Sequence, residues 1–235
     1  MQYDNLDKIR EFIHDTSRTS GESFVKINEQ HYVVAYTGNV EEGTSGVYGV
    51  IKTLKLDENY NISQTNAFVH ENISSVHGSS FIHLSGNYYV LIYVNSHHAY
   101  PEDDYGVVLK MFTITGSNYS IITEIDKKVI ENGYYLSITS SDIIKVSDDR
   151  FIVTYSCLTD SEDGFSYAKV RFYEWVDDGR VGFEYLDAIL YEYREYLDLF
   201  TWYRRLVTGH KFISLNKDLY ILNYNLELQD YRSVV

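Results

Sequence analysis

The sequence predicts an all-β fold made of a repeated unit of four antiparallel strands. Two observations carry this prediction. The chain of 235 residues holds 24 Tyr and 11 Phe but a single Pro, a composition rich in strand-forming aromatic residues. In addition, a thirteen-residue pattern that ends in tyrosine recurs four times without a gap, which indicates a tandem repeat of one supersecondary unit.

The four copies of the pattern share one internal organisation. Each has a short apolar run, a polar stretch of four residues, and then a run rich in β-branched and aromatic residues, which is typical of a β-hairpin. Seven columns are apolar or aromatic in all copies, and the last column is always tyrosine. The copies are residues 24–36, 81–93, 143–155 and 212–224, ending in Tyr36, Tyr93, Tyr155 and Tyr224.

Two further strands follow three of these hairpins. A third apolar run and, after a polar turn, a fourth lie downstream of each, so the predicted unit is a four-stranded antiparallel sheet. The third runs are residues 47–56, 107–114 and 167–175, and the fourth contain residues 68–69, 129–130 and 189–190. The repeat tyrosines fall on the second strand, where we expect them to pack between neighbouring units and bond adjacent backbone.

The N-terminal residues resemble a fourth strand. Residues 5–14 align without gaps to residues 61–70, so we expect this segment to complete the last unit, close a ring and leave no sheet edge exposed. The whole pattern resembles the four-bladed β-propeller architecture. We expect one domain over residues 1–235, with repeat units at about 16–72, 73–133, 134–192 and 193–235 and the N-terminal strand at 3–15. A β-sandwich is the alternative.

That resemblance concerns architecture alone. The sequence has no WD dipeptide, kelch diglycine or sialidase Asp-box, so no family's activity is implied. In a propeller, the loops after the second and fourth strands share one face. These are the longer loops here, so we expect binding groups on that face, called the long-loop face below.

The predicted long-loop face is acidic. Its loops place carboxylates at equivalent positions of three units, which favours a cationic partner or a divalent ion. The alternative is that these side chains are simply solvated. The residues are Glu41, Glu42, Glu102, Asp103, Asp104, Asp160, Glu162 and Asp163.

Candidate chemistry is sparse. His97 and His98, close to the acids of the same loop, are the best candidates for a divalent metal, although one loop is a poor frame for a zinc site. The lone Cys157 indicates an inert thiol, and residues 43–46 and 77–80 indicate Gly/Ser turns rather than a nucleophile elbow. We therefore expect no catalytic residue and no required cofactor.

An aromatic and basic insertion interrupts the repeat between residues 192 and 212. Tyr193, Tyr196 and Phe200 have helical spacing, which predicts a short helix that caps the channel. Tyr, Trp and Arg dominate binding hot spots, so this insertion, together with the acidic loops, is the candidate ligand or partner surface. The alternative is that its aromatic residues fill the channel as core. The insertion residues chosen are Tyr196, Trp202, Tyr203, Arg204 and Arg205.

The formal charge of −14 argues against a nucleic-acid partner, and no apolar run is long enough to predict membrane insertion. We expect a soluble, non-catalytic module that binds a protein or a glycan. Two alternatives are a hydrolase or lyase acting at the channel mouth and a structural component of a viral or multiprotein particle. The expected location is cytoplasmic or virion-associated, since no signal peptide is seen. The sequence does not determine the oligomeric state.

Overall fold

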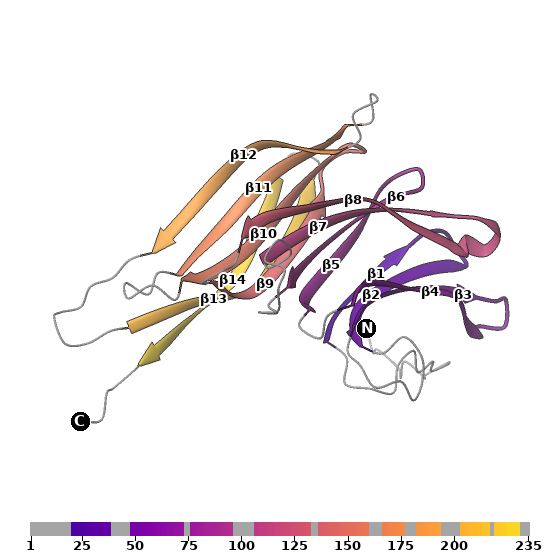
Figure 1. Cartoon of the computed structure of the whole chain (residues 1–235), viewed down its shortest axis with the longest axis horizontal. Helices are drawn as coiled ribbons and strands as arrows, with labels where there is room; N and C mark the ends of the chain where they lie inside the picture. Colours follow the sequence, from indigo (N-terminus) through magenta and orange to yellow (C-terminus); the bar gives the residue numbers. More distant parts are fainter. Residues whose placement is uncertain are drawn as a thin grey trace, which may run out of the picture.

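The computed structural model describes residues 20–38, 48–72, 76–95, 106–132, 136–159, 166–176, 182–193, 203–216 and 219–230. These residues form antiparallel sheets in chain order (Figure 1). Sheet A contains β1 (Ser20–Lys26), β2 (His31–Gly38), β3 (Tyr48–Leu56) and β4 (Ile62–Glu71). Sheet B contains β5 (Val76–Ser85), β6 (Tyr88–Asn95), β7 (Gly106–Thr115) and β8 (Ile121–Asn132). Sheet C contains β9 (Leu136–Lys145), β10 (Arg150–Thr159), β11 (Ser166–Val176) and β12 (Gly182–Tyr193). Sheet D pairs β13 (Tyr203–Asn216) with β14 (Leu219–Asp230).

The four predicted hairpins are confirmed, and all four have one register. In every copy of the thirteen-residue pattern the first residue pairs with the eleventh, because the polar stretch turns the chain at the same place. The pairs are Phe24 with Val34, Phe81 with Leu91, Ile143 with Val153, and Phe212 with Leu222.

The predicted third and fourth strands are confirmed as well. They are β3, β7 and β11, followed by β4, β8 and β12, and each lies beside the preceding strand of its sheet. The repeating unit is therefore an all-β, four-stranded antiparallel meander, as its alternating apolar pattern indicated.

Successive sheets pack through their first strands. β1 contacts β5, β5 contacts β9, and β9 contacts β13, so the sheets follow one another across the molecule in chain order (Figure 1). None of the described sheets closes on itself. The segment predicted to close the ring, residues 3–15, lies outside the described residues.

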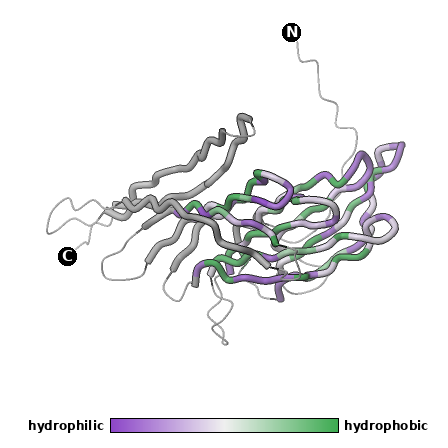
Figure 2. Tube along the Cα trace, turned by 90° about the horizontal axis from the view of Figure 1, so that it is seen from above, coloured by the Kyte–Doolittle hydropathy of each residue, from purple (hydrophilic) through white to green (hydrophobic). Residues whose placement is uncertain are grey.

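Hydrophobic stretches run along the strands, and hydrophilic segments gather at the hairpin turns (Figure 2). The buried hydrophobic residues form three clusters. One core cluster lies between sheets A and B and includes Val33, Ile51 and Phe112. A second lies between sheets B and C and includes Leu109 and Tyr155. A third, described below, consists of sheet A residues alone.

Two local predictions were wrong. Residues 77–80, predicted as a turn, lie within β5, where the pairing register shifts between His77 and Ser80. Part of the predicted aromatic connection is strand: Tyr193 ends β12, and Tyr203, Arg204 and Arg205 begin β13. A long first strand explains the strand at residues 77–80 and at 203–205, because each first strand starts before its copy of the pattern, whereas Tyr193 is strand because the fourth strand β12 extends to it. Within the described chain, no helix has the length and apolar character needed to cross a membrane.

Candidate functional site

Most of the predicted site residues lie outside the described residues. They are Tyr196, Trp202, Asp103, Asp104, Asp160, Asp163, His97 and His98. The backbones of Tyr203, Arg204 and Arg205 pair in β13 with Asp230, Gln229 and Leu228. Among the residues that the structure describes, no group of three or more His, Cys, Asp or Glu side chains could hold a metal ion.

The structure instead brings together a buried carboxylate, a repeat tyrosine and a cation at the interface of sheets A and B. Glu71 is the last residue of β4, and its Oε2 accepts a hydrogen bond of 2.6 Å from the Tyr93 hydroxyl on β6. Lys110 Nζ on β7 lies 3.4 Å from the same oxygen and 3.0 Å from Glu124 Oε2, while Lys127 Nζ lies 3.6 Å from Glu71. We call this arrangement the first carboxylate clamp: Glu71, Tyr93 and Lys110.

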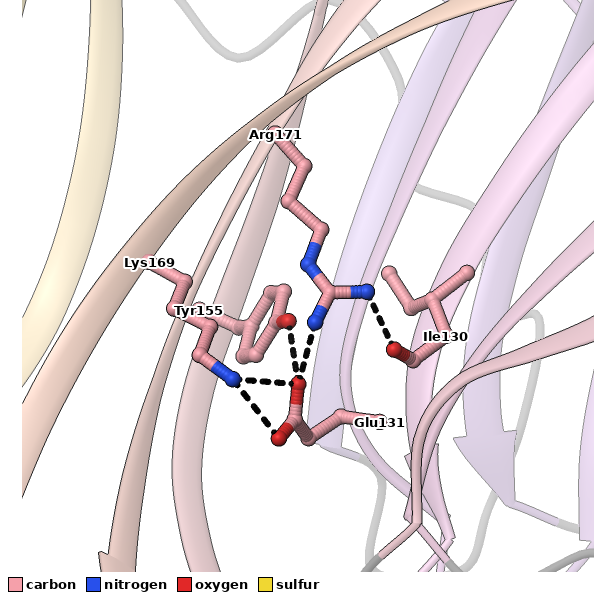
Figure 3. A network of polar contacts seen from close by, with 5 residues as sticks. All are labelled: Ile130, Glu131, Tyr155, Lys169 and Arg171. Atoms are coloured by element: carbon pink, nitrogen blue, oxygen red, sulfur yellow. Dashed lines mark hydrogen bonds and ion pairs between the residues drawn. The ribbon is translucent and has the colours of Figure 1, made fainter. Parts of the chain in front are cut away.

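The same arrangement recurs between sheets B and C, where it forms the second carboxylate clamp (Figure 3). Glu131 near the end of β8 accepts a 2.8 Å hydrogen bond from the Tyr155 hydroxyl on β10. From β11, Lys169 Nζ lies 2.8 Å from both carboxylate oxygens, and Arg171 Nη2 lies 2.6 Å from Oε2. The second clamp therefore consists of Glu131, Tyr155, Lys169 and Arg171.

A bulge in the fourth strand builds each clamp. On β4, Glu71 pairs with Gly49 and Val69 pairs with Val50, so His70 between them has no partner residue on β3. On β8, Ile130 before Glu131 is an extra residue in the same way. A bulged residue leaves the ladder and frees backbone groups for other partners. Accordingly, Lys110 Nζ donates to the carbonyl of His70, and Arg171 Nη1 donates to the carbonyl of Ile130.

The tyrosine and the cation also recur in sheet A. Lys52, Lys110 and Arg171 occupy equivalent positions, because each pairs with the eleventh residue of its copy of the pattern. Each cation lies over the ring of its own repeat tyrosine: Lys52 is 5.5 Å from the Tyr36 centroid, Lys110 is 5.7 Å from Tyr93, and Arg171 is 5.5 Å from Tyr155. Cations over aromatic faces are attracted by the ring quadrupole, most strongly where water is excluded.

The second clamp keeps the Glu131 carboxylate ionised. Burial opposes ionisation of Glu131, but hydrogen bonds from Lys169 and Tyr155 and the charges of Lys169 and Arg171 outweigh it, so its pKa is lowered. A carboxylate with these donors is a poor general acid. Each clamp instead ties the end of one sheet's fourth strand to the second and third strands of the next sheet.

Sequence reasoning assigned the repeat tyrosines to packing between units, and for Tyr93 and Tyr155 the structure agrees. Their hydroxyls each donate to a carboxylate of the preceding sheet, which the sequence did not indicate. The missed signal was a carboxylate column that ends the fourth strand: Glu71, Glu131 and Glu192, with Asp15 at the aligned position of the N-terminal segment.

Neither the models of known protein families nor the curated proteins with which the chain was compared match it.

Proposed function

We propose that this chain is a non-catalytic binding module. Its sheets are the blades of a four-bladed β-propeller, which the N-terminal segment closes, and its acidic long-loop face binds a basic protein surface. The observation that carries this proposal is the position of the strand cations near that face.

Those cations already form ion pairs between the packed sheets. Glu71 and Glu131 lie at the strand ends that lead into inter-sheet connections, and Lys110, Lys169 and Arg171 all pair with them. Lys52 and Lys110 are each only 3 % exposed. Buried cations with near partners contribute little to the potential outside, so the loop acids are left to set the charge of the face.

The clamps also support a binding role by fixing strand ends. Loops bind with less entropic loss when the strands that carry them are rigid. Each clamp joins two successive sheets close to the start of a third strand, where the loop after the second strand ends. We therefore expect neighbouring long loops to keep a fixed spacing. A fixed array of acidic loops suits a basic protein surface.

The first test measures binding of a fluorescent ten-residue polylysine probe at low salt, with the loop variant Glu102→Gln/Asp103→Asn/Asp104→Asn. Its matched control is Glu29→Gln/Glu58→Gln/Asp148→Asn, which removes three exposed acids from tight turns at the opposite ends of the strands. Both variants change the net charge equally. We expect the loop variant to bind the probe several-fold more weakly and the control to bind within about twofold of wild type, because contacts beyond about 10 Å are screened.

Equal weakening of both variants would mean that net charge alone attracts the probe, which contradicts the assignment of a binding face. A glycan array on wild type and on Trp202→Ala/Tyr203→Ala distinguishes the other ligand class. Glycan binding that this substitution abolishes would replace the protein partner with a glycan, and turnover of a glycan would refute the non-catalytic role.

A further inference from the structure

One face of sheet A is buried without a described sheet against it. The third core cluster contains Val34, Tyr36, Val50 and Leu54, which are 0–6 % exposed, with Tyr32, Tyr48 and Ile62 packed beside them. All of these come from β2, β3 and β4. Side chains alternate between the two faces of a strand, and Val33, Ala35 and Ile51 face sheet B, so the third cluster lies on the face away from sheet B.

The equivalent face of sheet B shows what such a face binds. In sheet B this face carries Leu91, Tyr93 and Phe112, and it packs on sheet A. Phe68 of β4 packs there, with its ring centroid 6.0 Å from that of Phe112, and Glu71 completes the first clamp. The third cluster has Val34, Tyr36 and Leu54 at the corresponding positions. Phe24, beside it on β1, is 58 % exposed, whereas the equivalent Phe81 is 3 % exposed.

The N-terminal segment carries the side chains that this face would need. In its gapless alignment with β4, Phe12 corresponds to Phe68, Ile13 to Val69, His14 to His70 and Asp15 to Glu71. The connection fits too: Asp15 precedes Phe24 by nine positions, as Glu71 precedes Phe81 by ten. The charges match, because Tyr36 and Lys52 form the donor half of a clamp, with Lys52 Nζ over the Tyr36 ring.

We propose that residues 5–15 dock as a strand against the third cluster, and that Asp15 accepts hydrogen bonds from Tyr36 and Lys52 as the carboxylate of a further clamp. Phe12 then lies against Leu54 as Phe68 lies against Phe112. This inference rests on the closed ring of the proposed function. It adds the specific contacts, from Asp15 to Tyr36 and Lys52, that would hold the ring closed.

A double-mutant cycle in the full chain tests the docking. Asp15→Asn and Tyr36→Phe are nearly isosteric, and the unfolding equilibrium constant is measured for both single variants and the double variant by urea denaturation. We expect the two changes to be coupled by roughly tenfold, because a hydrogen bond to a charged acceptor is broken by either one. The cycle of Glu71→Gln with Tyr93→Phe, two residues in direct contact, calibrates the size of the coupling.

Asp7→Asn is the matched control within the segment, because Asp7 aligns with the exposed Ser63. It is expected to show additive effects with Tyr36→Phe. Additive effects of Asp15→Asn and Tyr36→Phe would overturn the proposal, as would a coupling that grows with protein concentration while light scattering shows a dimer, since the segment would then come from a second copy. Stability coupling and polylysine binding are separate measurements: loss of the coupling refutes the docking of residues 5–15, whereas loss of probe binding refutes the basic partner of the long-loop face.

Discussion

At the scale of single residues, the repeat tyrosine has a polar role as well as a packing one. Its ring fills the space between sheets, and its hydroxyl satisfies a buried carboxylate of the preceding sheet. An ionised carboxylate leaves water at high cost unless several donors replace the water, and Glu131 has three side chains that donate to it. This polar requirement gives the last column of the pattern a reason to be Tyr rather than Phe.

The substitution Tyr155→Phe tests that role. It keeps the ring but removes one donor from Glu131, so we expect a loss of about 1.5–3 kcal/mol in the free energy of unfolding, measured by urea denaturation. Tyr60→Phe is the control, because Tyr60 is 56 % exposed, and a change within about 0.5 kcal/mol is expected there. Equal effects of the two substitutions would show that the hydroxyl of Tyr155 adds nothing to stability.

At the scale of elements, period-two alternation and turn position predicted the hairpins and their common register. This worked because both signals are local: a polar stretch of fixed length turns the chain, and β-branched residues fill the strands on either side. The bulges at His70 and Ile130 could not be predicted in this way. No local sequence feature distinguishes an extra residue in a strand from a paired one, since the bulge is stabilised by a cation from the next sheet.

The clamps were missed for the same reason. Glu131 and Arg171 are 40 positions apart in sequence, and their contact depends on how two sheets pack. The repeat could have suggested it, because Glu71, Glu131 and Glu192 lie at or next to the ends of three equivalent strands. The acidic clusters that the sequence makes conspicuous are instead in loops, where acids are close along the chain, and those residues lie outside the described part of it.

Gly49 on β3 shows how closely one bulge packs on its neighbour. A Cβ at this position would lie 2.4 Å from Cε1 of His70, whose ring lies 5.0 Å from Tyr93 and 6.3 Å from Phe112, measured between centroids. The ring has little room to move, so we expect Gly49→Ala to destabilise the protein by about 1–3 kcal/mol in thermal or urea unfolding. In a His70→Ala background the clash is gone, and Gly49→Ala should cost clearly less. If Gly49→Ala destabilised the His70→Ala variant as much as wild type, the clash with His70 would not be the cause of the destabilisation.

At the scale of the whole molecule, the charge of −14 divides between two environments. Lys52 and Lys110 are buried within the sheets, and Lys110 neutralises carboxylates there, whereas the acidic clusters that the sequence places in loops lie outside the described residues. The packed sheets also hold a titratable group near lysine side chains. His70 is buried, and neither of its ring nitrogens has a hydrogen-bond partner among the described residues. Stability should therefore depend on pH through His70.

Burial, and then the charges of Lys110 and Lys127, hold the pKa of His70 well below its usual 6.5. Below that pH the unfolded chain binds a proton that the folded chain excludes, so stability is full above about pH 6.5 and falls as the pH drops, by at most about 1.4 kcal/mol per pH unit. The lowered pKa of Glu131 acts in the usual carboxyl range and below it, so its effect lies mostly below the window of about pH 5–6.5 in which His70 acts. Urea unfolding across that window should show a slope that His70→Ile flattens, since isoleucine occupies the equivalent bulge position at Ile130. A slope that persists in His70→Ile would assign the pH dependence to another group.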